Sequence, residues 1–424
     1  MLDRTQAPEF HKIKEINIIR TNKATLSNQN TVYTLPLGEQ ELVRIEWLLE
    51  AGNFYNKLNG QAFFTLKMLQ EGTKTRNSNQ ISADIDQYGA FLEVNNHFDQ
   101  AEIILYCPTR YVSEVIPIVA EMLFEPTFPE SELEILKRRQ SQELQINFQK
   151  TTYLAGRAFR KALFGDKHPY GKSLEIEEIE QINTQVLREF YSNYIQNSVL
   201  EILVSGYFDD SVLKTLDTYF GKYTPKTTQK PSFEMIVPTH SESIFVEKTG
   251  SLQNTIRVGK HIINKHHPDY FKLAVTNTIL GGYFGSRLMQ NIREDKGYTY
   301  GIFSSLQNLR NTSFVGIGTD VKAEFTQNTL TEIYKEIEVL QNEKVSKEEL
   351  ERVKNYMAGS FASGITTAFS QMDLFKEIHL HQIGYGFYEN YLETIEAITP
   401  EHILEMAQTH YQKQDLIEIV AGSK

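Results

Sequence analysis

The chain has 424 residues, so two domains of about 200 residues each are expected, because a single hydrophobic core rarely grows that large. Its 43 Lys and Arg against 54 Asp and Glu give a formal net charge of -11, and without a strongly basic stretch this excludes nucleic acid as a partner. The single cysteine, Cys107, excludes an intramolecular disulfide framework and favours a reducing compartment.

The amino-terminal segment shows no targeting pattern. The first 20 residues, MLDRTQAPEFHKIKEINIIR, interleave charged with apolar side chains and leave no apolar run for a signal peptide. No segment reaches the roughly 18 consecutive apolar residues of a membrane span, so no membrane partner is predicted. We therefore expect a cytoplasmic protein, with the periplasm as the alternative if a leader has been removed.

The predicted elements alternate between strands and amphipathic helices along the whole chain. Apolar or alternating runs predict strands at 42–50, 101–107, 254–260 and 313–319. Helices are predicted from 61 to 69 and from about 128 onward, and others recur between the later strands. Strands mixed with helices in this way indicate an α+β fold.

The second half of the chain repeats the first. The stretch IEQINTQVLREFYSNYIQNSVLEILVSG from Ile179 matches IEAITPEHILEMAQTHYQKQDLIEIVAG from Ile395, an offset of 216 positions. FPESELEILKRR from Phe128 matches VSKEELERVKNY from Val345, an offset of 217, and a weaker match from Tyr88 has an offset near 208. Three matches in one order at nearly one offset predict two copies of a unit of about 200 residues.

These copies define the predicted domains. We place an amino-terminal domain at 1–225, a carboxy-terminal domain at 244–424, and between them a linker at 226–243 that carries prolines among polar residues. Each domain is predicted to be a mainly antiparallel β-sheet covered on one face by helices. Two such domains can line one side of a chamber, so we expect half of a clamshell.

A motif helix follows the first strand. QAFFTLKMLQEGTKTRNSNQISADIDQYGA, from Gln61, places an apolar pair and a Gly-Thr pair after this helix, then a second helix that ends in YGA. This order resembles the amino-terminal domain of the pitrilysin or insulinase family of zinc peptidases, the inverzincins. Their helix carries His-x-x-Glu-His, in which two imidazoles bind zinc and the carboxylate activates its water.

The metal-binding residues of that motif are absent here. Aligned on the Gly-Thr pair, the three motif positions fall at Phe63, Leu66 and Lys67. A phenyl ring and an isobutyl group have no lone pair and an ammonium repels a cation, so no metal is predicted in this chain. The resemblance places the family's third ligand, a Glu on a later helix, at Glu143 or Gln145, and both alternatives stay open. An ion pair between Lys67 and Glu143 is a further hypothesis.

The second half retains a different part of the pattern. LAVTNTILGGYFGSRLMQNIREDKGYTYGIFSSL, from Leu273, contains a Gly-rich turn, Ser-Arg-Leu, a helix and Arg-Glu-x-x-Gly-x-x-Tyr, ending in Arg293 and Tyr300. The carboxy-terminal domain of the same family is similar in order and spacing. The resemblance implies that Arg293 and Tyr300 hold the peptide main chain and steady the oxyanion, roles that suit a guanidinium and a phenol.

Two hypotheses follow from the resemblance. Some members of the family divide the work between a zinc-bearing chain and a chain that keeps only the Arg and Tyr. By this reading the protein is the zinc-free subunit of a heterodimeric, processing-peptidase-like enzyme, with no cofactor of its own, zinc in a paralogous partner, and peptides as substrates. The alternative is a non-enzymatic scaffold or peptide-binding homologue that acts in assembly. Substrate identity and the choice between homodimer and heterodimer are not encoded in any motif.

Overall fold

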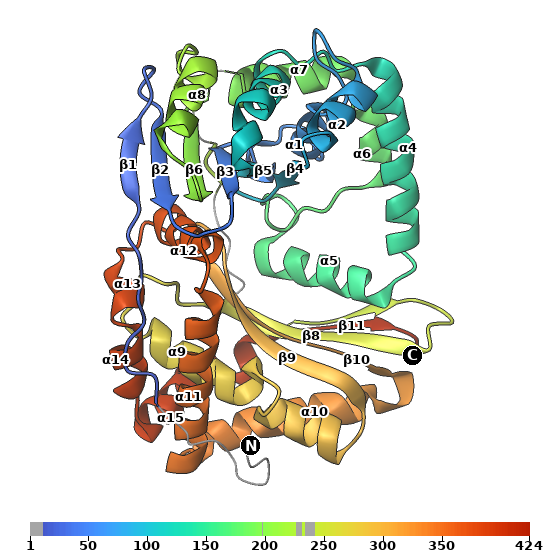
Figure 1. Cartoon of the computed structure of the whole chain (residues 1–424). Coiled ribbons are helices and arrows are strands. Elements are labelled where there is room, and N and C mark those ends of the chain that lie inside the picture. Colours follow the sequence, from blue (N-terminus) through green and yellow to red (C-terminus); the bar gives the residue numbers. More distant parts are fainter. Residues whose placement is uncertain (1–11, 197, 226–230, 234–241) are drawn as a thin grey trace, which may run out of the picture.

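The structure is a computed structural model that describes residues 12–196, 198–225, 231–233 and 242–424. Its backbone forms two sheets, each with its own helices (Figure 1). The first has six strands in the order β1-β2-β6-β3-β5-β4, and the second has five in the order β7-β11-β8-β10-β9. All neighbours are antiparallel except β2–β6 and β7–β11, which are parallel. The predicted α+β fold with two mainly antiparallel units is confirmed.

The strands of the amino-terminal unit are β1 (Asn22–Thr25), β2 (Thr31–Pro36), β3 (Leu42–Leu49), β4 (Phe91–Asn96), β5 (Ala101–Pro108) and β6 (Glu201–Gly206). Its helices are η1 (Asn53–Tyr55), α1 (Gln61–Met68), α2 (Ser78–Asp86), η2 (Thr109–Tyr111), α3 (Val112–Phe124), α4 (Glu130–Asn147), α5 (Thr151–Phe164), α6 (Ile176–Gln181), α7 (Thr184–Tyr194) and α8 (Asp210–Phe220).

The strands of the carboxy-terminal unit are β7 (Ser243–Glu247), β8 (Gln253–Ile262), β9 (Thr299–Asn308), β10 (Ser313–Lys322) and β11 (Ile417–Gly422). Its α and 3-10 helices are α9 (Tyr270–Asn277), η5 (Ala323–Phe325), α10 (Thr326–Asn342), α11 (Lys347–Gly364), α12 (Ala368–Leu380), α13 (Gly386–Glu389), α14 (Tyr391–Glu396), α15 (Pro400–His410) and η6 (Lys413–Asp415). Two π-helices, η3 (Thr278–Gly282) and η4 (Met289–Asp295), complete this unit.

The repeat in the sequence corresponds to a repeat in the structure. The pairs α4 and α11, α5 and α12, α7 and α15, and β6 and β11 occupy equivalent positions along the two units. The caps repeat as well: Asn183 accepts from the Val186 amide at 3.0 Å, and Thr399 accepts from the His402 amide at 3.4 Å. An N-cap of this kind satisfies an amide that has no partner inside its helix.

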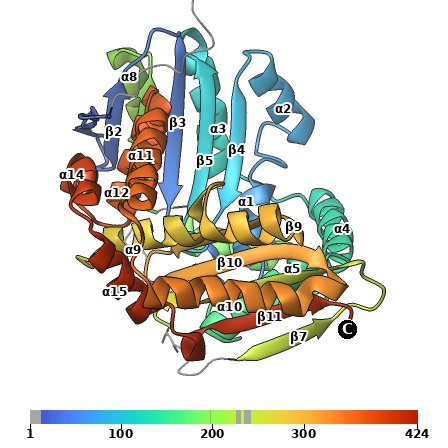
Figure 2. The same cartoon turned by 90° about the horizontal axis from the view of Figure 1, so that it is seen from below.

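Each unit lends one helix to the sheet of the other. Helix α5 packs against β8 and β11 on the face opposite α9, α10 and α15, and α12 packs against β2 and β6 (Figures 1 and 2). Alternation along β11 matches this arrangement, because Ile417, Ile419 and Ala421 join the core that contains α5 while Val420 joins the core of its own unit. The sequence predicted helices on one face of each sheet. It did not predict the additional helix, α5 or α12, that each unit places on the sheet of the other.

Buried charges also join the two units. The Arg44 guanidinium of β3 lies 2.7 Å from a carboxylate oxygen of Asp373 in α12 and 2.7 Å from one of Glu46. Lys376, also in α12, lies 2.7 Å from Glu46. The side chains of Arg44 and Glu46 are 5% and 1% exposed, so water screens their pairing very little. The two units are thus tied by both apolar packing and ion pairs.

The predicted linker at 226–243 lies largely outside the described residues, although its last residue begins β7. The domain boundaries at 225 and 244 stay predictions. Among the helices that the structure describes, none is long and apolar enough to cross a membrane.

Candidate functional site

Helix α1 holds the three motif positions, and each side chain has an ordinary structural role. Leu66 is buried in the core of the amino-terminal unit, and half-buried Phe63 packs against that core. Lys67 donates from Nζ to the backbone oxygen of Val94 in β4 at 2.7 Å. Burial and the nearby charge of Arg139 lower the pKa of Lys67. Lys67 thus ties α1 to β4.

These residues do not fit a zinc ion. None of the three has a lone pair to offer while Lys67 stays protonated. Glu143 and Gln145 lie on α4 with exposed side chains, so the structure adds no ligand that would favour one over the other. In the part of the chain that the structure describes, no group of three or more His, Cys, Asp and Glu is placed to hold a metal ion. Among the described residues Lys67 and Glu143 form no ion pair, and the Lys67 amine donates instead to Val94.

Tyr300 stands at the start of β9 and points away from the protein. Two residues of β9, Tyr300 and Gly301, lie opposite the single Asp320 of β10, because the register shifts between Thr319 and Val321. Such a β-bulge turns a side chain out of the usual alternation. The Tyr300 side chain is 93% exposed, and its hydroxyl has no hydrogen-bond partner among the described residues. This phenol is available to a molecule outside the chain.

Arg293 lies seven residues earlier, on the π-helix η4. Its guanidinium carbon lies 4.5 Å from the centre of the Phe284 ring, and Nη1 lies 3.3 Å from a Glu294 oxygen in an exposed pair. A cation over a ring face is a weak attraction that leaves the N–H donors free to bind a ligand. Gly297, at φ 66°, ends this helix in a left-handed conformation that favours glycine.

The neighbouring Arg287 is already occupied. Its Nε and Nη2 donate to the two carboxylate oxygens of Glu349 in α11, both at 2.8 Å. Because Arg287 lies just before η4, this bidentate ion pair holds the start of η4 against α11. Of these two arginines, Arg293 is the less engaged, because only its Nη1 forms an ion pair, with the exposed Glu294.

Exposed aromatic rings surround the Arg293 and Tyr300 segment. Phe284 and Phe303 are 63% and 54% exposed, and the Phe303 ring lies over Gly301. Large aromatic side chains of this kind are enriched where proteins contact one another. Arg293 and Tyr300 belong to the carboxy-terminal unit, whereas the motif positions Phe63, Leu66 and Lys67 belong to the amino-terminal unit. Neither Arg293 nor Tyr300 lines the cavity that lies beside α1.

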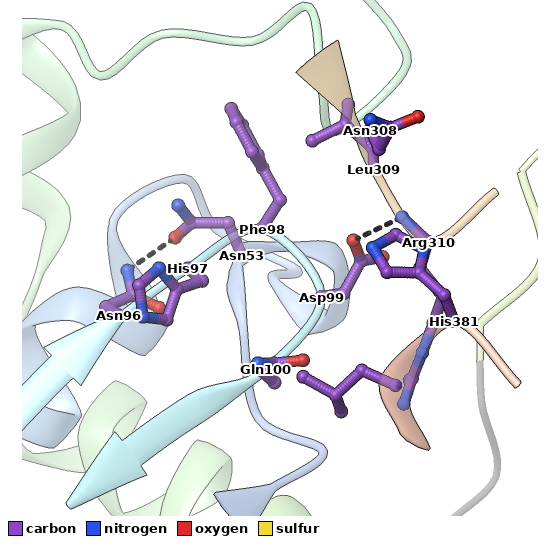
Figure 3. A pocket seen from close by; sticks show the side chains of 11 residues that line it. Asn53, Asn96, His97, Phe98, Asp99, Gln100, Asn308, Leu309, Arg310 and His381 are labelled. Carbon is purple, nitrogen blue, oxygen red and sulfur yellow. Dashed lines mark hydrogen bonds between the residues drawn. The ribbon is translucent and has the colours of Figure 1, made fainter. Parts of the chain in front are cut away.

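Two adjoining cavities are present, one between the two units and one within the amino-terminal unit. The first, of about 430 Å³, lies between the β4–β5 turn, the β9–β10 turn and the end of α12 (Figure 3). Here Asp99 accepts from the Tyr170 hydroxyl at 2.6 Å and from the Arg310 amide at 3.4 Å. Burial and the Asp99 charge raise the pKa of Tyr170, so this hydroxyl remains a donor.

The second cavity, of about 380 Å³, lies beside α1 between α4 and α5. It shares Asn53, Asn96 and Phe98 with the first cavity, and its lining also includes Phe63 and Glu143. Half of its other lining residues are amides or basic side chains, namely Asn56, Asn59, Gln140, Asn147, Arg160 and Lys172. The sequence analysis missed these residues, because the lining comes from segments far apart in the chain and only Phe63 and Glu143 stood in a motif.

Fold and site together define a two-domain α+β protein whose motif helix carries no metal ligand. Comparison with known proteins identifies its family. The description "Insulinase (Peptidase family M16)" matches residues 38–176, and "Peptidase M16 inactive domain" matches 181–357. Because two descriptions of one family together cover most of the chain, the chain belongs to the M16 peptidase family.

Its relatives differ in whether they are named as peptidases. The chain is 24% identical over 376 residues to the uncharacterized zinc protease YmxG of Bacillus subtilis, covering 87% of this chain and 89% of that protein. It is 23% identical over 370 residues to the non-peptidase homolog YmxG of Helicobacter pylori, covering 86% and 85%. The crystal structure of a peptidase M16 inactive domain from Pseudomonas fluorescens shares the fold, with a TM-score of 0.84, 21% identity and coverage of 96% and 99%.

Proposed function

We infer that this protein is the non-catalytic subunit of a two-chain M16 peptidase, in which it binds peptide and completes the site of a zinc-bearing partner through Arg293 and Tyr300. The observation that carries this inference is the outward Tyr300, 93% exposed on its bulge, in a chain whose own motif helix lacks zinc ligands. A phenol without a hydrogen-bond partner among the described residues, on the same segment as the partly engaged Arg293, suits a reacting group that another chain supplies.

The chemistry assigned to the pair is electrostatic. In peptide hydrolysis negative charge develops on the carbonyl oxygen, and preorganised N–H and O–H donors stabilise it. Arg293 supplies donors in a fixed plane and Tyr300 supplies one hydroxyl. Zinc in the partner would activate the attacking water there, and this chain's residues would orient the peptide.

The sheets offer a way to hold that peptide. β4 and β9 are the terminal strands of their sheets and each pairs on one side only among the described residues. The main chain of such a strand can bind an extended peptide as an additional strand. Since Tyr300 is the second residue of β9, a peptide along this strand would pass close to the phenol.

The test begins by isolating the partner with tagged full-length protein from the native host and identifying any His-x-x-Glu-His chain that copurifies. We expect the mixture to cleave a fluorogenic peptide and this chain alone to be inactive. Tyr300→Phe should lower kcat by about 100- to 1000-fold, the usual effect of removing one oxyanion donor, with zinc content unchanged. Tyr207→Phe, at a 48% exposed tyrosine of the other unit, is the matched control.

Two results would refute the proposal. Peptide hydrolysis by the purified chain alone would contradict a non-catalytic subunit. Full activity of a mixture that contains Tyr300→Phe would contradict the role of the phenol and favour the scaffold alternative.

A further inference from the structure

Arg160, on α5, is a charged side chain without a counter-ion. Its Nη2 donates to the Ser173 hydroxyl at 2.8 Å, but its Nε is buried and has no hydrogen-bond partner. No carboxylate of the described residues forms an ion pair with it, whereas Arg157, one turn earlier, pairs with Glu175. Burial lowers the pKa of Arg160, and the positive charge of Arg157 adds to this effect. The protein therefore leaves this guanidinium incompletely satisfied.

The unsatisfied guanidinium lines the cavity beside α1, and an unsatisfied acceptor lines the same cavity. Asn96 donates from Nδ2 to the Asn53 side-chain oxygen at 2.8 Å, as Figure 3 shows, while its own Oδ1 is buried without a partner. Lys172, exposed at this cavity, forms no ion pair with any described residue. The side chains of Arg160 and Asn96 thus line one space together with a second positive charge, while their unsatisfied Nε and Oδ1 atoms lie buried behind its wall.

A ligand that satisfies these groups must carry both a carboxylate and an N–H. A carboxylate can accept two parallel bonds from a guanidinium, which is the strongest pairing available to Arg160. An N–H next to that carboxylate would supply the donor that Asn96 Oδ1 lacks, once ligand binding turns this buried amide toward the cavity. Inorganic phosphate is a poorer match, because it offers mainly acceptors and has no N–H for Asn96. The volume of about 380 Å³ is within the range of small-ligand sites.

We propose that this cavity binds the carboxyl terminus of a peptide, with Arg160 and Lys172 holding the carboxylate and Asn96 accepting the N–H of the terminal residue. The proposal rests on the proposed function, since it assumes that the protein binds peptides, and it specifies which end of the peptide is bound. It places that recognition at the positions where the family's zinc motif is absent. Phe63, half-buried on the cavity wall, would contact the terminal side chain.

The experiment measures fluorescence anisotropy of the full-length protein with labelled peptides. The probe is a pool of ten-residue peptides randomised over uncharged residues and labelled at the amino end. It is made as the free acid, as the carboxamide, and as the carboxamide with one internal Glu. The free acid should bind at least about 10-fold more tightly than either carboxamide, the scale expected for losing a charge-assisted hydrogen bond.

Two variants with the same change in charge locate the site. Arg160→Gln should weaken binding of the free acid at least about 10-fold and remove its advantage over the carboxamide. Arg138→Gln, at an exposed arginine of α4 outside the cavity lining, should change neither. Since Arg160 is buried without a counter-ion among the described residues, Arg160→Gln should also leave the melting temperature unchanged or raised, which a purely structural role would not predict.

The outcomes separate this inference from the proposed function. Equal affinity of acid and carboxamide, or equal effects of the two variants, would overturn carboxyl-terminus recognition while leaving peptide binding intact. Tight binding of the carboxamide with internal Glu would overturn it in favour of an acidic side chain. Absence of binding by all three pools would overturn both proposals.

Discussion

Truncation of one buried side chain in the carboxy-terminal unit should destabilise the amino-terminal unit equally. Ile333 lies on α10 and is 0% exposed, in a core that the amino-terminal unit does not share. Ile333→Ala removes three carbons, worth about 0.8 kcal/mol each, and leaves a cavity that raises the total to about 3–4 kcal/mol. Because α5 and α12 each bury the sheet of the other unit, we expect both units to unfold in one transition.

Trp47 makes this prediction measurable. It is the only tryptophan of the chain and is fully buried in the amino-terminal unit, so its fluorescence reports that unit alone, while circular dichroism reports both. In urea, with an m value of about 3 kcal/mol/M or more, Ile333→Ala should lower both midpoints together by about 1 M. Leu252→Ala, at an 89% exposed leucine of the carboxy-terminal unit, is the control and should leave both unchanged. An unshifted Trp47 midpoint beside a two-step dichroism curve would refute the coupling.

Two further predictions concern buried titratable groups. Burial alone would raise the pKa of Glu102, but the hydrogen bond from His97 and the charge of Lys376 outweigh it and lower the pKa to about 2. Because the pKa of Glu102 is lower in the folded protein than the unfolded value of about 4.5, its carboxylate stabilises the fold above that pH, and this stabilisation is lost as pH falls toward 2. Glu102→Gln should therefore cost about 3 kcal/mol of unfolding free energy near pH 7 and clearly less near pH 3 in urea titrations. A cost independent of pH would contradict this. Burial raises the pKa of Cys107 to about 12, so its thiol should react with Ellman's reagent only after unfolding, and rapid reaction of the native protein would show that the site opens.

The sequence predicted the repeat well, because apolar periodicity and capping residues are local signals. Asn183 and Thr399 begin equivalent helices, as their matching segments indicated. The exchange of α5 and α12 was not predictable in this way. Phe159 of α5 faces β8 at Gly259, where an added Cβ would lie 2.8 Å from the ring. In the sequence Phe159 shows only that the helix has an apolar face, and it does not show which sheet that face covers.

The candidate site was predicted unevenly for a similar reason. The helix predicted at 61–69 contains Phe63, Leu66 and Lys67, the positions that the family resemblance assigns to the motif, and the structure puts them on α1. The outward direction of Tyr300 depends on a β-bulge opposite Asp320. No turn-forming residue in the sequence indicates this bulge. Arg160 escaped notice because an arginine in an amphipathic helix usually has a partner or faces water, and whether it has one depends on contacts distant in sequence.

The polar cavity beside α1 is harder to explain by stability than by binding. A helix that has no metal ligands could close over its cavity with apolar side chains, and replacing buried charges by packed apolar groups is often stabilising. This chain instead lines one cavity with Arg160 and Asn96, whose buried Nε and Oδ1 atoms have no hydrogen-bond partner. Unsatisfied groups of this kind persist where the surrounding structure holds them for a ligand. A pure scaffold would need neither this cavity nor the exposed Tyr300, whereas a peptide-binding subunit would use both.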